Sequence, residues 1–328
     1  MTDSTKHPPD NPRKQLLSTR QRPAIMAGLL ASLLSTTGVR TSVAGEDRLT
    51  ITATTGQVGD LVKNIGGEYV NADSLMGPGV DPHLYKASER DVVDLIDSDA
   101  IYYSGLHLEG KLGEVLEQLA ERRAVTAVTD GIPIDLLMTP EDFEGNPDPH
   151  VWFDPRLWAY CADQTTVSLT AVDERHAATY AENANVFKAQ LDDAHAYALE
   201  QFGSIPDQQR VLVTAHDAFG YLGRAYDIEV VGLQGISTST EAGVRDVQRI
   251  ADLLVERQVP TIFVETSVPR RTIEAVQVAA SDRGWEVSIG EPLYSDALGD
   301  AASAEGTYLG MFHYNVDTIT NGLKGSSS

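Results

Sequence analysis

The residues of this sequence best suited to chemistry are three histidines in polar surroundings. Two of them end a repeated Asp-Pro-His tripeptide, at Asp81 to His83 and at Asp148 to His150, and the third, His216, precedes Asp217. Proline fixes its own φ and keeps the preceding residue extended, so the first two imidazoles are expected on stiff loops outside helices. Asp-Pro is also a common turn opener, but two copies followed by a third histidine favour the presentation of metal ligands.

The elements that must position these histidines begin with an N-terminal α/β lobe. Strands are predicted at 49–54, 69–70, 100–104 and 124–128, with helices at 56–65, 88–97 and 111–122 between them. Strands that alternate with helices predict a parallel sheet covered by helices on both faces. Residues 45–172 are therefore assigned to this lobe.

A single long helix is predicted over 173–203. No Gly or Pro occurs between Asp173 and Phe202, and Asp173 is suited to be the N-cap residue ahead of an acidic first turn. The apolar residues keep a three-four spacing along one stripe, made of Tyr180, Ala184, Phe187, Leu191, Ala194, Ala198 and Phe202. Thirty residues of helix measure about 45 Å at 1.5 Å each, so we expect the helix to bridge two lobes.

The alternation resumes beyond Pro206. Strands are predicted at 210–214, 229–233, 261–265 and 286–289, and helices at 218–226, 241–258, 271–282 and 308–323. Residues 204–324 therefore form a second parallel-sheet lobe, and 325–328 a flexible tail. The predicted fold class is α/β, with two lobes bridged by one helix.

The metal site is expected in the cleft between these lobes, because ligands gather at the carboxyl ends of parallel strands. His216 follows the strand at 210–214, and Asp296 follows the strand at 286–289, while His83 and His150 lie in loops of the first lobe. Three imidazoles and a carboxylate suit Zn²⁺ or Mn²⁺, with Fe²⁺ as a further candidate. They suit Ca²⁺ and Mg²⁺ poorly, since these ions prefer oxygen ligands.

The N-terminus predicts export. Five basic residues precede the apolar run at 24–34, and Ser42 to Ala44 offers small residues for cleavage, so 1–44 is assigned as a signal peptide. The run is shorter than the about 20 residues that span a bilayer. The one cysteine, Cys161, lies well inside the mature chain, so neither a lipid anchor nor an intrachain disulfide is expected. We expect a soluble periplasmic monomer.

The charge of the chain limits its partners. The formal net charge is −23, and residues 1–44 hold six basic and two acidic residues, so the mature chain carries −27. Such a field repels nucleic acid and anionic lipid and attracts cations. A solvated acidic surface suited to a saline habitat explains most of this excess, so charge alone identifies no ligand.

The remaining histidines are expected to be solvated residues and not ligands. They are His7 in the signal peptide, His176 and His195 off the apolar stripe, and His313 in the last helix. His107 follows the strand at 100–104, and whether it assists the metal site is left open. Glu265 ends the strand at 261–265 and is a candidate acceptor for a hydrogen bond from a ligand imidazole.

Four segments of the sequence together carry a family resemblance. Residues 81–85, 148–155, 216–221 and 296–297 resemble, in order, the ligand segments of the metal-binding proteins of bacterial zinc/manganese ABC transporters, the cluster A-I solute-binding family. The likeness continues through 232–237, 263–268 and 306–311, so it covers nearly all of the mature chain. It implies pseudo-symmetric lobes, a metal held by His83, His150, His216 and Asp296, and a membrane permease as partner.

Two departures from the family bear on which metal is bound. Zinc-dedicated members often carry a long histidine-rich loop before the second ligand. In this chain the corresponding segment, 106–149, has one histidine, His107. Manganese-dedicated members often place Glu at the third ligand position, where this chain has His216. The two departures point in opposite directions, so zinc and manganese both stay open.

A secreted zinc hydrolase is the alternative function. A hydrolase needs an open coordination position for water and a nearby general base, whereas four protein ligands close the shell. Neither His-Glu-x-x-His nor Gly-x-Ser-x-Gly occurs in the chain. We therefore expect no enzyme but a protein whose cargo is one divalent metal ion; an adhesin role is compatible with this and rests on no feature of the sequence.

Overall fold

Parallel strands flanked by helices make up both halves of the protein in its computed structural model, which describes residues 48–143 and 145–325. The predicted signal peptide and residues 326–328 of the predicted tail lie outside the described residues. None of the helices described combines the length and the apolar character that a bilayer crossing requires.

The strands are β1 (Leu49–Ala53), β2 (Val70–Ser74), β3 (Ala100–Tyr103), β4 (Ala124–Ala127), β5 (Val211–His216), β6 (Glu229–Gln234), β7 (Thr261–Ile262) and β8 (Ser288–Ile289). The helices are α1 (Gly56–Gly66), α2 (Glu89–Asp97), α3 (Gly113–Ala120), α4 (Pro155–Val172), α5 (Ala177–Gly203), α6 (Gly220–Tyr226), α7 (Val244–Arg257), α8 (Arg271–Ser281) and α9 (Tyr308–Lys324).

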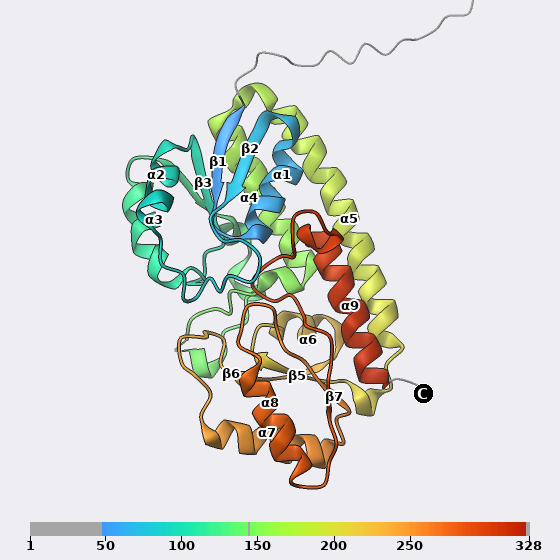
Figure 1. Cartoon of the computed structure of the whole chain (residues 1–328). Coiled ribbons are helices and arrows are strands. Elements are labelled where there is room, and N and C mark those ends of the chain that lie inside the picture. Colours follow the sequence, from blue (N-terminus) through green and yellow to red (C-terminus); the bar gives the residue numbers. More distant parts are fainter. Residues whose placement is uncertain (1–47, 144, 326–328) are drawn as a thin grey trace, which may run out of the picture. The chain divides into compact units, whose positions relative to one another are not determined.

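The N-terminal lobe is built on one parallel sheet of order β2-β1-β3-β4 (Figure 1). Ile51 of β1 pairs with Ala72 on one side and with Ala100 on the other, which places β1 and β3 inside the sheet. Ile101 packs with Leu95 of α2 on one face, while the neighbouring Tyr102 belongs to the core shared with α1 and α4 on the other face. Alternate residues of one strand therefore serve two helical layers, as a doubly covered parallel sheet requires.

The C-terminal lobe repeats this arrangement with shorter pairing. β5 pairs with β6 and β7 with β8, all parallel, and a hydrogen bond from Phe263 N to Val213 O (2.9 Å) joins the two pairs. The resulting order, β6-β5-β7-β8, matches that of the first sheet. The strands predicted at 261–265 and 286–289 pair with each other over only two residues each, while Phe263 and Val264 make backbone hydrogen bonds to Val213 and Leu293 outside that ladder.

The long helix α5 bridges the two lobes, running beside α1 and α4 of the first and α6 and α9 of the second (Figure 1). All seven residues of the predicted apolar stripe are buried, so the stripe is confirmed. Because these residues belong to a core that also holds Ile51 of the first sheet and Leu212 of the second, one continuous apolar core underlies both lobes.

The start of the bridge differs from the prediction. Residues Glu174–His176 form a 3-10 turn before α5, and Asp173 is the N-cap residue of this turn, as predicted, but its side chain makes no capping hydrogen bond. The Asp173 carboxylate binds the His176 ring and accepts from Tyr180 Oη (3.1 Å), so it binds side chains of the first turns and not backbone amides. The carboxylate is occupied by these side-chain donors, so it does not bind the free amides at the start of the helix.

Candidate metal centre

Four side chains that the sequence analysis singled out converge between the lobes. One ligand atom each from His83, His150, His216 and Asp296 can be chosen so that all four lie within 4.8 Å of one another, and all four residues are buried. His83 follows β2, His150 follows β4, His216 is the last residue of β5 and Asp296 follows β8. The site therefore lies at the carboxyl ends of both sheets, as parallel-sheet topology predicts.

Asp296 is the centre of this group. Its carboxylate oxygens lie 3.7 Å from His83 Nε2, 3.4 Å from His150 Nε2 and 3.8 Å from His216 Nε2. His83 Nε2 and His150 Nε2 are 3.3 Å apart. Three Nε2 atoms and a carboxylate thus face one small volume, which is the donor set of a four-coordinate divalent ion.

His150 is held by a carboxylate from its own motif. Asp148 Oδ1 accepts hydrogen bonds from the His150 backbone N–H (2.9 Å) and from its ring Nδ1 (2.7 Å). The ring therefore presents Nε2 to the site, with the proton on the nitrogen that faces Asp148. From the sequence Asp148 is expected only as part of a stiff turn, although its spacing of two residues from His150 is a signal for this role.

His83 shares half of that arrangement. Its backbone N–H donates to Asp81 Oδ1 (2.9 Å), as in the second motif. The other oxygen, Asp81 Oδ2, accepts from Thr238 Oγ1 of the opposite lobe (2.6 Å) and not from the histidine ring. The two Asp-Pro-His copies therefore have the same turn and different outer partners.

His216 was predicted on a loop, and instead it ends β5, where it pairs with Gln234 of β6. Glu265 was a candidate acceptor for a ligand imidazole, and it acts on the backbone instead. Its Oε1 accepts from the His216 N–H (3.1 Å) and its Oε2 from the Ala215 N–H (3.2 Å). Burial, with the charge of Asp296 added, raises the pKa of Glu265 to about 8, against the two amide hydrogen bonds.

The loop of Asp296 is fixed through its neighbour Ser295. The Ser295 carbonyl accepts from Gln57 Nε2 (3.2 Å) and from Trp152 Nε1 (3.1 Å), both of the N-terminal lobe. Asn315 of α9 exchanges two further hydrogen bonds with the backbone of Tyr294. The carboxylate of the second lobe is thereby placed by contacts from the first.

Electrostatics divide the three imidazoles into two kinds. Burial lowers the pKa of His83 to about 3 and that of His216 to about 4, although the charge of Asp296 opposes both shifts. Burial also acts to lower the pKa of His150, but the charge and hydrogen bond of Asp148 and the nearby charge of Asp296 outweigh it and raise that pKa. Burial acts to raise the pKa of Asp296, yet the surrounding imidazoles hold it well below its usual range. At neutral pH His83 and His216 are therefore neutral, whereas His150 is an imidazolium that carries a second proton, on Nε2.

The remaining described histidines lie outside this group. His195 binds Tyr226 Oη (3.0 Å), His313 Nδ1 binds the Leu309 carbonyl (2.8 Å), and His176 stacks on Tyr69. His107 is exposed and borders a separate small cavity beside Glu109. These histidines have partners or solvent of their own, and no ligand role follows for any of them.

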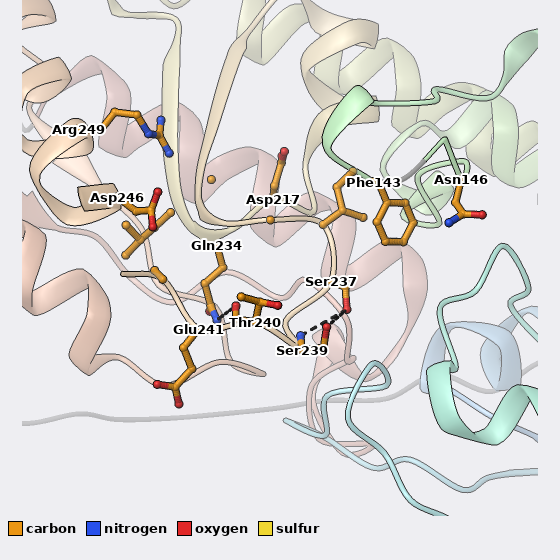
Figure 2. A pocket seen from close by; sticks show the side chains of 15 residues that line it. Phe143, Asn146, Asp217, Gln234, Ser237, Ser239, Thr240, Glu241, Asp246 and Arg249 are labelled. Carbon is orange, nitrogen blue, oxygen red and sulfur yellow. Dashed lines mark hydrogen bonds between the residues drawn. The ribbon is translucent and has the colours of Figure 1, made fainter. Parts of the chain in front are cut away.

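A cavity of about 550 Å³ lies next to the centre without including its four residues (Figure 2). Asp217 and Gln234, the neighbours of His216 in the chain and in the sheet, are among its lining residues, together with Arg249 of α7. Its far wall includes Phe143 and Asn146 from the segment before His150. The cavity borders the loop that follows β6.

Comparison with known proteins agrees with this geometry. The family described as zinc-uptake complex component A periplasmic matches residues 51–322. The chain belongs to this family. The prediction of a binding component of zinc/manganese uptake systems, and not of an enzyme, is thereby confirmed.

Individual relatives match over almost their full lengths. The manganese-binding lipoprotein MntA of Bacillus subtilis is 45% identical over 92% of this chain and 100% of its own. The zinc-binding protein TroA of Treponema pallidum is 44% identical over 90% of this chain and 95% of its own. The solved structure of the periplasmic zinc-binding protein TroA from Treponema pallidum has a TM-score of 0.82, covering 85% of this chain and 100% of its own.

The protonation pattern predicts that metal binding near pH 7 releases about one proton, from His150. Because the folded-state pKa of His150 is raised, the proton competes with the metal throughout the range below that pKa, so affinity falls up to about tenfold per pH unit as pH decreases. Calorimetric titration in buffers of different ionisation enthalpy measures the released protons. Equal affinities at pH 5 and pH 7.5 would contradict a site made of three imidazoles.

Removal of one central imidazole is expected to weaken binding far more than removal of a peripheral one. His150→Ala deletes a donor from the buried group and should raise the dissociation constant by more than about 100-fold, beyond the loss typical of an outer partner. His195→Ala is the matched control, since its ring binds only Tyr226, and it should change affinity less than about twofold. Comparable losses in the two variants, measured by calorimetry, would mean that the site lies elsewhere.

Proposed function

We propose that this protein captures one divalent transition-metal ion outside the cytoplasm and delivers it to the membrane permease of an ABC transporter. The ligands in this proposal are His83, His150, His216 and Asp296, and the cargo is zinc or manganese, with iron as a further candidate.

The observation that carries the proposal is a buried donor set left without partners. Among the described residues, no hydrogen-bond partner is present for either carboxylate oxygen of Asp296 or for Nε2 of His216. All three atoms are buried. Buried polar atoms without partners are costly, and a buried carboxylate is more costly still. A divalent cation on the Nε2 atoms and the carboxylate would satisfy these atoms at once and offset the charge of Asp296.

The position of the ligands supports transport and not catalysis. Two ligands come from each lobe, so displacing one of them from the opposite lobe would open the donor set and release the ion. Four protein donors fill a tetrahedral shell and leave no position for an activated water, which a zinc hydrolase requires. The comparisons contain nothing that favours a hydrolase.

We further propose that the protein acts in the periplasm as an exported monomer after removal of 1–44. The basic and apolar pattern of that segment supports export. The relative MntA is a lipoprotein, whereas the one cysteine of this chain, Cys161, is buried in α4, and this supports a form without a lipid on cysteine.

The relatives do not decide which metal is bound, because MntA is named for manganese and TroA for zinc. The metal preference must therefore be inferred from the proposed ligands. Imidazole at His216 supplies a borderline nitrogen, whereas a carboxylate there would add a hard oxygen that suits manganese. At a given nitrogen/oxygen site zinc normally binds more tightly than manganese. We therefore propose that His216 favours zinc over manganese.

The test is competition titration of the wild type and of His216→Glu with zinc and manganese. The wild type should bind one ion per chain, with zinc preferred, and in His216→Glu the zinc-over-manganese affinity ratio should shrink by about tenfold or more. A wild type that binds no first-row divalent ion would contradict the proposed function. A ratio unchanged or larger in His216→Glu would show that His216 is not a ligand.

A further inference from the structure

The four proposed ligands are not held equally firmly. His216 is part of β5, with ladder pairing to β6 and a carboxylate on its amide. Asp296 follows a segment in which Leu293 N donates to Val264 O (2.8 Å) and Ser295 O accepts two side-chain donors. Both ligands of the C-terminal lobe are therefore fixed by its sheet and by neighbouring side chains.

His150 is fixed by a dense local network. Asp148 N donates to Met138 O (2.9 Å), the residues after His150 form a 3-10 turn, Val151–Phe153, and α4 begins at Pro155. Tyr221 of the opposite lobe adds a hydrogen bond from its Oη to the Asp148 carbonyl (2.9 Å). Loss of any one of these bonds would leave the others in place.

The loop of His83 lacks such a network. Between Gly77 and Tyr85 the backbone forms only short turns, at 78–79, closed by Val80 N donating to Gly77 O (3.2 Å), and at 82–84, with no ladder pairing to a strand. Tyr85 fixes the end of the loop by donating to Asp91 of α2 (2.8 Å). Between these points the backbone of His83 is held by Asp81, whose Oδ1 accepts its N–H.

Asp81 is in turn fastened to the opposite lobe. Its Oδ2 accepts from Thr238 Oγ1 at 2.6 Å, and the Thr238 side chain comes from the loop after β6. Thr238 is buried, with 6% of its surface exposed. One hydroxyl therefore connects the first histidine loop to the C-terminal lobe through a single carboxylate.

The loop that carries Thr238 is backed by open space. Every residue from Gly232 to Ala242 lines the 550 Å³ cavity except Thr238, and Figure 2 shows Ser237, Ser239 and Thr240 along its wall. A loop that borders a cavity can shift without opening an apolar core. Thr238 can therefore move away from Asp81 with little loss of packing.

We propose that the hydrogen bond between Asp81 and Thr238 keeps the His83 loop closed over the bound ion and sets how fast the ion leaves. This inference rests on the proposed function, because it concerns release of the same cargo. Thr238 is a positioning residue that acts on His83 through Asp81, and it does not touch the metal. When the bond breaks, the loop carries His83 away while the other three ligands stay in place.

The test measures release of zinc from the mature chain into excess chelator by stopped flow. Thr238→Val keeps the shape of the side chain and removes the donor, and a hydrogen bond to a charged group corresponds to about 10- to 100-fold in an equilibrium or rate. We expect zinc to leave at least about tenfold faster from Thr238→Val, and Thr238→Ser, which keeps the hydroxyl, to restore the wild-type rate.

Two comparisons separate this role from a general loosening of the loop. Thr240→Val makes the same substitution two residues away, at an exposed side chain whose hydroxyl has no hydrogen bond among the described residues, and should leave the release rate unchanged. Tyr221→Phe removes the hydroxyl that donates to the Asp148 carbonyl and accepts from Met138 N (3.1 Å), and it should accelerate release less than Thr238→Val. The cobalt-loaded Thr238→Val protein should show the wild-type d–d absorption spectrum, because all four ligands are retained.

The outcomes are distinguishable. Zinc release from Thr238→Val at the wild-type rate, equal acceleration in Thr240→Val, greater acceleration in Tyr221→Phe, or a changed cobalt spectrum would each overturn the proposal while the wild type still binds one ion. A wild type that binds no ion would overturn the proposed function, and this inference with it.

Discussion

The structure depends on a buried carboxylate that stands among three imidazoles. Asp296 is fully enclosed, and an isolated ionised carboxyl in such a place would be strongly disfavoured. The imidazoles compensate in the metal-free protein, where His150 as an imidazolium faces Asp148 with Nδ1 and Asp296 with its Nε2 proton. A divalent ion would replace that proton and bring two charges to the same place, which is why metal binding and protonation compete at this site.

The rest of the fold keeps this group assembled from two separate sheets. Each lobe has the same strand order, once the hydrogen bond from Phe263 to Val213 joins the strand pairs of the second, and each contributes two of the proposed ligands from the carboxyl ends of its strands. The helix α5 and the apolar core along it hold both sheets in a fixed relation. Hydrogen bonds across the cleft, from Trp152 and Gln57 to Ser295 and from Tyr221 to Asp148, then set the positions of individual ligands.

Much of this arrangement is predictable from local sequence. The alternation of strand and helix periods predicts both lobes, the uninterrupted stripe predicts α5, and the repeated Asp-Pro-His predicts two ligand loops. These features are local, since periodicity and prolyl geometry act within a few residues. The strand ends add His216 and Asp296 to the candidate ligands, the resemblance to a known family implies the same four residues, and the structure brings them together.

The differences arise where the outcome depends on long-range partners. Glu265 was expected to meet an imidazole, but its place in the second sheet turns it toward the amides of β5. Asp81 and Asp148 occupy identical motifs, yet one meets Thr238 and the other the ring of its own histidine. Sequence spacing cannot distinguish these cases, because the deciding partner of Asp81 is 157 residues away.

The central claim is that three imidazoles and one carboxylate bind the ion, and zinc-edge X-ray absorption of the zinc-loaded protein tests it most directly. The account predicts a shell of four nitrogen and oxygen donors at about 2.0–2.2 Å, with the outer-shell scattering of three imidazole rings. A sulfur donor at about 2.3 Å, or a shell with fewer than three imidazoles, would contradict it.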